Sequence, residues 1–73
     1  MKTTLEVQPN ISASNEKLIL ENLSTLENIW NISINSTCVF FEYMIWADLK
    51  VVRRELKELG YNIINDTHKF NNL

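Results

Sequence analysis

Hydrophobic and polar residues alternate along this chain with two different periods, which predict six secondary-structure elements. Apolar residues recur every three or four positions in residues 15–27 and again from Leu49 to Leu59, as they do on one face of an α-helix. Period-two alternation or short apolar runs predict four strands, at residues 3–7, 30–34, 38–44 and 61–65. The predicted order of elements is therefore βαββαβ.

Capping residues support the predicted ends of the two helices. Ser12 or Ser14 can cap the start of the first helix. Asn28 follows that helix and tolerates the left-handed conformation in which helices often end. Gly60, the only glycine of the chain, lies just past the last periodic residue of the second helix, where a C-terminal cap is expected.

Two helices of this length can cover only one face of a four-stranded sheet. We therefore expect an α+β fold, a ferredoxin-like βαββαβ sandwich with a four-stranded antiparallel sheet and both helices on one face. One domain should span residues 1–66, followed by a flexible polar tail at residues 67–73. The expected core residues are Ile19, Leu23, Leu26, Ile32, Ile34, Phe41, Val52, Leu56 and Leu59.

Composition narrows the possible functions of the chain. With 73 residues and a net charge of −2, it lacks the basic character of a dedicated nucleic-acid binder. It has no apolar run long enough to predict a membrane span, and its single cysteine and the lack of a signal-peptide core favour a cytoplasmic location. One histidine, no base–nucleophile pair and no phosphate loop predict that it is not an enzyme.

The order and spacing of the elements resemble a known family. The third strand ends in Phe41-Glu42-Tyr43 and the second helix in Leu59-Gly60-Tyr61. With the apolar spacing of the first helix, these residues resemble the heavy-metal-associated domain of copper chaperones and of metal-transporting P-type ATPases, over roughly residues 3–65. The resemblance implies a ferredoxin-like fold and a role in metal binding and transport.

The family's metal motif, Cys-x-x-Cys, is missing from this chain. The resemblance places the two cysteines at Ser12 and Asn15, and it places Tyr61 beside the metal. Cu(I) prefers paired thiolates, which neither a hydroxyl nor an amide can replace. The simpler interpretation is that Ser12 and Asn15 cap the first helix.

Cys38 is the remaining candidate metal ligand. It opens the third strand, at the same end of the predicted sheet as Ser12 and Tyr61, whereas His68 should lie at the opposite end. One hypothesis is a weak one-thiol site for Cu(I) or Zn(II), or a site shared across a dimer. The alternative is that Cys38 serves packing only.

Apolar and basic segments suggest two possible surfaces for a partner. Phe40 should lie on the open sheet face near Trp30 or Met44, and with Met44 and Trp46 it could bind a protein partner or form a homodimer. The alternative is scattered surface apolarity. RNA-recognition modules also use aromatic residues in strands, but no basic residue and glycine precede the aromatic residues here.

The basic segment from Lys50 to Lys57 is expected to form a solvated helix face, because Glu55 and Glu58 interleave with it. It could still dock an acidic partner.

Two functional hypotheses follow from the sequence. The chain is a metal-trafficking protein, as the resemblance implies, or a domain that has lost metal binding and keeps its fold for contact with other proteins.

Overall fold

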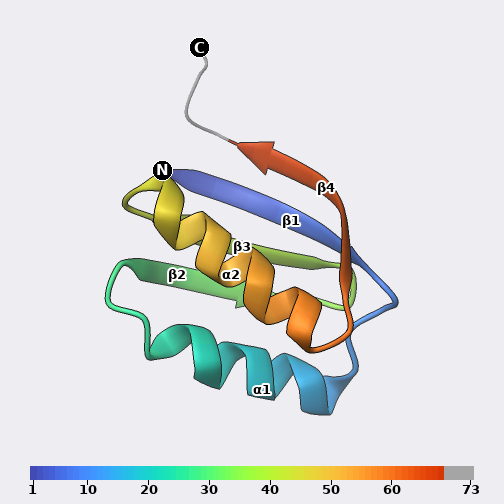
Figure 1. The fold of residues 1–73 in the computed structure, drawn as a ribbon. Helices are drawn as coiled ribbons and strands as arrows, with labels where there is room; N and C mark the ends of the chain where they lie inside the picture. Colours follow the sequence, from blue (N-terminus) through green and yellow to red (C-terminus); the bar gives the residue numbers. More distant parts are fainter. Residues whose placement is uncertain (69–73) are drawn as a thin grey trace.

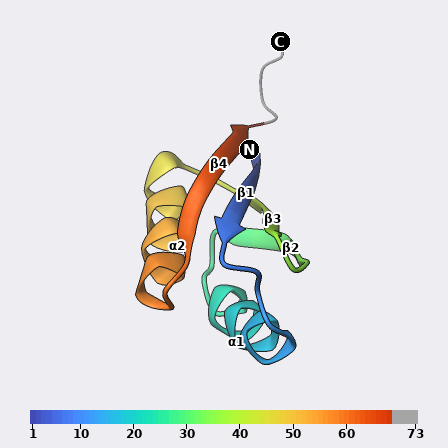
Figure 2. The same cartoon turned by 90° about the vertical axis from the view of Figure 1, so that its right-hand side faces the viewer.

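A computed structural model of the chain describes residues 1–68 and contains the six expected elements. These are β1 (Lys2–Gln8), α1 (Ala13–Ser24), β2 (Ile29–Ile34), β3 (Cys38–Tyr43), α2 (Trp46–Glu58) and β4 (Asn62–His68). The strands form one antiparallel sheet in the order β2-β3-β1-β4, and both helices cover the same face (Figures 1 and 2). The predicted ferredoxin-like α+β fold is confirmed.

Neither helix in residues 1–68 combines the length and apolarity needed to cross a membrane.

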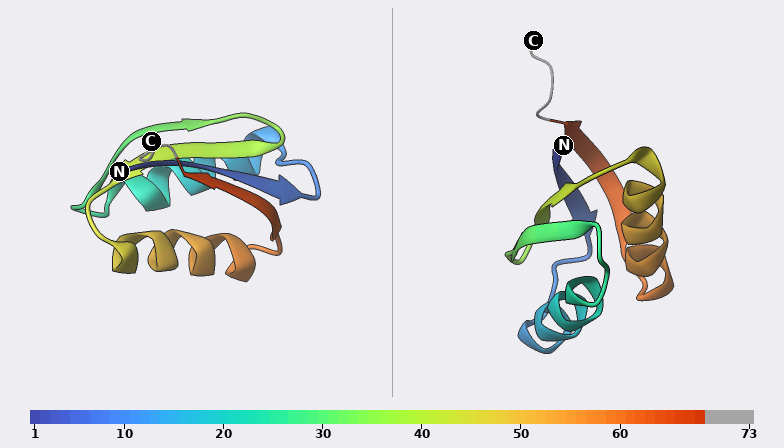
Figure 3. Two further views of the ribbon diagram at one scale, coloured as in Figure 1. Left: turned by 90° about the horizontal axis from the view of Figure 1, so that it is seen from above. Right: turned by 90° about the vertical axis from the view of Figure 1, so that its left-hand side faces the viewer.

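The β1–α1 loop, the β2–β3 turn and the α2–β4 connection lie at one end of the sheet, as expected (Figure 3). Backbone hydrogen bonds join the first two of these connections. The N–H of Ile11 donates to the carbonyl of Ser36 at 2.7 Å, and the N–H of Val7 donates to the carbonyl of Thr37 at 2.9 Å. This end of the molecule holds the residues that the sequence singles out as candidate ligands.

The core fills the space between the sheet and the helices. In β3 the side chains of Val39, Phe41 and Tyr43 are buried, whereas those of Cys38 and Phe40 lie on the open face. Of the predicted core residues, five are buried, namely Ile19, Leu23, Phe41, Val52 and Leu56. The remaining four, Leu26, Ile32, Ile34 and Leu59, are partly buried and pack against the core.

A bulge in β2 places Trp30 on the open face of the sheet with Phe40, as expected. Simple alternation would place Trp30 on the same face as Ile32, but Asn31 adopts a positive φ of 52° and the pairing with β3 shifts between Trp30 and Ser33. The extra residue of the bulge sends Trp30, which pairs with Glu42, to the open face. Ile29 takes its place in the core.

The first helix follows Ser12, one of its two predicted caps, but it ends earlier than predicted. It spans Ala13–Ser24, and Thr25 is its C-cap in the right-handed conformation, with its hydroxyl donating to the carbonyl of Asn22 at 2.8 Å. Asn28 therefore does not end the helix, and its backbone is not left-handed. At the end of α2, by contrast, Gly60 has a φ of 95°, as expected of a glycine cap.

The last strand is longer than predicted. It continues to His68, so the expectation that the strand ends at Asn65 was wrong. The reason is a polar contact inside the fold, because the hydroxyl of Thr3 donates to Asp66 at 2.8 Å and Arg53 on α2 forms an ion pair with the same carboxylate. His68 pairs with Thr3, at the opposite end of β1 from the partner of Cys38, Glu6. Of the predicted tail at residues 67–73, residues 69–73 lie outside the described residues.

Candidate functional site

The β1–α1 loop, where the resemblance places the metal motif, forms a helix cap. Ser12 is the N-cap of α1, with φ −73° and ψ 161°, and its hydroxyl accepts a hydrogen bond from the backbone N–H of Asn15 at 3.2 Å. The hydroxyl of Ser14 lies 3.3 Å from that of Ser12. These contacts are those of an ordinary serine cap, which satisfies an N–H at the start of the helix.

The partly buried side chain of Asn15 contacts Tyr61. Its amide nitrogen donates to the Tyr61 hydroxyl at 2.7 Å, and the Tyr61 side chain is buried. This bond joins the first turn of α1 to the residue that precedes β4. The structure therefore brings together Ser12, Asn15 and Tyr61, three of the four predicted site residues.

Cys38, the fourth, lies on the other side of the sheet. Its neighbour Val39 points into the core, so the alternation of the strand directs Cys38 to the open face, where it is partly buried. Its backbone N–H donates to the side chain of Asn35 at 2.8 Å, and its sulfur lies 3.6 Å from the Thr37 hydroxyl. Cys38 shares an end of the sheet with Ser12, as expected, but it does not share a face with it.

The donor atoms beside Ser12 do not fit a Cu(I) site. They are a hydroxyl, a carboxamide and a phenol, which are harder ligands than the thiolates that Cu(I) prefers. The amide nitrogen of Asn15 is already bonded to Tyr61. Among the described residues, no group of three or more His, Cys, Asp or Glu side chains could hold a metal ion.

A second candidate site is the connection between β3 and α2. Here Met44, Ile45 and Trp46 are consecutive in the chain and 61%, 55% and 56% exposed. We call these three residues the apolar turn. Ile45 is the N-cap residue of α2, in an extended conformation, and its N–H donates to the carboxylate of Asp48 at 2.9 Å. The cap thus fixes the backbone while three large apolar side chains remain accessible.

The expected surface of Phe40, Met44 and Trp46 is divided in two by the sheet. Phe40, 37% exposed, lies on the open face with Trp30, which is 40% exposed. Trp46 lies in the helix layer, where it lines a hollow with Leu49, Lys50 and Arg53. Of the two alternatives for these residues, one surface shared by Phe40 and Trp46 is not formed, because residue 46 already belongs to the helix that covers the opposite face.

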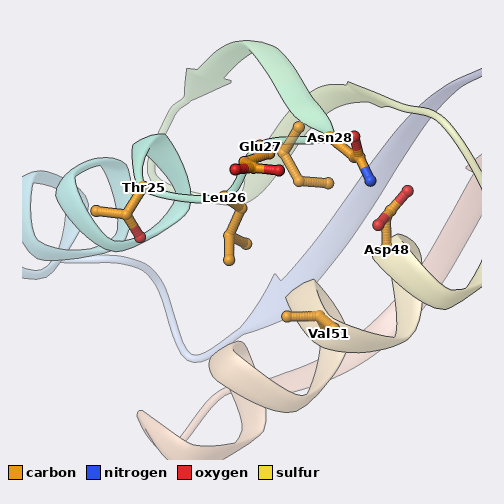
Figure 4. Close-up of a pocket in the computed structure, with 7 residues that line it drawn as sticks. Thr25, Leu26, Glu27, Asn28, Asp48 and Val51 are labelled. Atoms are coloured by element: carbon orange, nitrogen blue, oxygen red, sulfur yellow. The ribbon is translucent and has the colours of Figure 1, made fainter.

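A further hollow opens between the end of α1, the start of β2 and the first turns of α2 (Figure 4). Thr25, Leu26, Glu27 and Val51 line it, and the side chains of Asn28 and Asp48 point toward each other at its edge (Figure 4). Asp48 also caps α2 and Thr25 donates to Asn22. These polar groups already serve the ends of the two helices, so this hollow is a weaker candidate than the apolar turn.

Burial in the core changes the pKa of one tyrosine, Tyr43. It raises the pKa of Tyr43 above its usual value of 10.0, and the nearby carboxylate of Asp66 raises it further. Both effects disfavour the negatively charged phenolate. The neutral phenol of Tyr43 is therefore favoured in the folded protein. Asp66, which contributes to this effect, is also the residue that contacts Thr3 and Arg53.

Comparison with known proteins does not assign this chain to a family. No family model, no curated protein and no solved structure matches it.

Proposed function

We propose that this chain is a non-catalytic binding domain that contacts another protein through the apolar turn. The observation that supports the proposal is the exposure of three consecutive large apolar side chains, Met44, Ile45 and Trp46. Methionine and tryptophan are enriched in protein interfaces relative to the rest of protein surfaces. Three such residues adjacent in the chain are more exposed apolar side chains than scattered single ones, which is typical of an interaction site.

The residue at the N-cap of α2 supports the same proposal. Ser, Thr, Asp and Asn are strongly preferred at this position because their side chains accept an N–H of the first turn. The aliphatic side chain of Ile45 cannot accept, and the only side chain that acts at this helix start is that of Asp48, which accepts from the Ile45 N–H. A residue that is poor for stability but large and apolar is expected where the surface serves binding.

Metal trafficking, which the resemblance implies, receives less support. It needs two soft ligands on one loop, and that loop carries Ser12 and Asn15, which cap α1 and bond Tyr61. Cys38 stands on the other face of the sheet. Weak binding of Cu(I) or Zn(II) by Cys38 stays a prediction that a titration can decide.

The proposal can be tested by crosslinking in the cells that make the protein. A photoreactive amino acid placed at position 46 should capture a distinct protein, to be identified by mass spectrometry. The matched control is position 20 on α1, because Leu20 is also apolar and is 42% exposed. Capture of the same proteins from both positions, or of none from position 46, would contradict the proposal.

A further inference from the structure

Three of the four basic residues of α2 lie in one row with Trp46. Successive residues of a helix are about 100° apart, so positions separated by three and four residues form one row. Trp46, Lys50, Arg53 and Lys57 are spaced by four, three and four, and we call them the Trp46 row. The acidic residues of the helix, Asp48, Glu55 and Glu58, fall on the other flank. Arg54 lies between the two, four positions after Lys50 and four before Glu58, so basic and acidic residues adjoin there as expected.

An apolar hollow lies at the start of the Trp46 row. It is lined by Trp46, Leu49, Lys50 and Arg53. Leu49 is buried and Trp46 is 56% exposed, so an indole and a leucine line it together with the two basic side chains. A ligand for this place needs an apolar group and a negative charge next to each other.

The cations of the row are not neutralised equally within the fold. Arg53 forms an ion pair with Asp66, whereas no carboxylate of the described residues lies within ion-pair distance of Lys50 or Lys57. Like charges at i, i+3 and i, i+4 positions are mildly destabilising in a helix. An anionic group from outside would relieve this repulsion.

We infer that the Trp46 row binds an acidic segment of a partner protein, with an apolar side chain of that segment in the hollow. The inference rests on the proposed function and names the chemistry of the partner. The row is about 16 Å long at 1.5 Å per helical residue, which matches about five residues of extended chain. Glu55 and Glu58 on the adjoining flank would repel a long polyanion or an anionic membrane, so a short acidic peptide fits the surface better.

The test uses the full chain and a library of immobilised pentapeptides. Each peptide has one Leu, Phe or Met and four Asp or Glu residues, with the apolar residue placed at each position in turn, and a matched library carries Asn and Gln instead. We expect the acidic library to retain the protein at least about tenfold better. In two-dimensional NMR the best peptide should shift the amides of residues 46–57, and raising the salt concentration from about 20 to about 300 mM should weaken binding.

Variants then locate the contact. Lys50→Gln and Lys57→Gln should each weaken binding of the best peptide about two- to fivefold, and Trp46→Ala should weaken it more than about tenfold. Lys17→Gln, which removes an exposed basic residue of α1, should leave binding unchanged. The lysine variants alter only exposed side chains, so they remain informative if Trp46→Ala disturbs the fold.

Two results would overturn the inference. The first is the absence of any acidic peptide with a dissociation constant below about 1 mM. The second is that polyuridylate RNA or phosphatidylserine vesicles bind more tightly than any acidic peptide, and that Lys50→Gln and Lys57→Gln abolish this binding. If position 46 still crosslinks one protein while the acidic peptides fail, the proposed function stands and only the acidic chemistry of the partner is wrong.

Discussion

The side-chain amide of Asn15 donates a 2.7 Å hydrogen bond to the hydroxyl of Tyr61, a residue of the core. The resemblance to metal-binding domains gives one of these positions to a cysteine and the other to a residue beside the metal. In this chain the pair instead joins the start of α1 to the start of β4. The loop therefore has a structural role that needs no metal.

The Asn15–Tyr61 bond should contribute measurably to stability. Asn15→Ala and Tyr61→Phe should each lower the free energy of unfolding by about 0.5–1.5 kcal/mol, because each removes one partner of a partly buried hydrogen bond. Urea denaturation of both single variants and the double variant forms a double-mutant cycle. Losses that simply add in the double variant would show that the two side chains are not coupled.

Metal titration should separate the two functional hypotheses. The reduced wild-type protein and Cys38→Ser should compete equally poorly with a chelator for Cu(I) and Zn(II) under anaerobic conditions, because Cys38 faces away from Ser12 and Asn15. The double substitution Ser12→Cys and Asn15→Cys should gain tight Cu(I) binding, because it restores two thiols at a helix N-terminus. Tight wild-type binding that Cys38→Ser removes would instead support metal trafficking.

Stability should fall at high pH because of Tyr43. Its pKa is raised in the folded state by burial and by Asp66, so the folded protein holds this proton more tightly than the unfolded chain. The resulting stability is complete below the unfolded pKa of 10.0 and is lost as the pH rises through the folded pKa. Urea denaturation from pH 8 to 11, roughly spanning the unfolded pKa, should show a steeper decline for wild type than for Tyr43→Phe. Equal slopes would refute the shift.

Replacing Ile45 should separate stability from binding. Ile45→Ser places a preferred N-cap residue at the start of α2 and should raise the free energy of unfolding by about 0.5–1 kcal/mol. The same change removes an exposed apolar side chain and should weaken partner binding. Ser12→Ala at the α1 cap is the matched control and should lower stability by about 1 kcal/mol without affecting the partner. A loss of stability in Ile45→Ser would contradict this view of the cap.

The sequence predicted the order of elements and much of the core because hydrophobic periodicity reports directly on burial. It placed Ile19, Leu23, Val52 and Leu56 correctly, since each lies on the apolar face of a regular helix. It did not predict the bulge in β2, because one residue with a positive φ, Asn31, changes the face of the residues beyond it. No pattern of apolar residues reveals such a bulge.

The candidate site was predictable only in part. The proximity of Ser12, Asn15 and Tyr61 followed from the predicted topology, but their hydrogen bonds depend on side-chain geometry. The β4 extension depends on Asp66, a polar residue whose burial requires Thr3 and Arg53 from distant parts of the chain. The Trp46 row on α2 could have been found by plotting residues 46–58 on a helical wheel.

The most direct test of the proposed function uses the partner that is captured through position 46. The partner is purified, and its affinity for this chain is measured. We predict that Met44→Ser combined with Trp46→Ser weakens its binding by more than about tenfold. Phe40→Ser, on the opposite face of the sheet, should leave the affinity unchanged, and so should adding Cu(I) or Zn(II). Binding that depends on Phe40 or on metal, and tolerates the changes at Met44 and Trp46, would contradict the account.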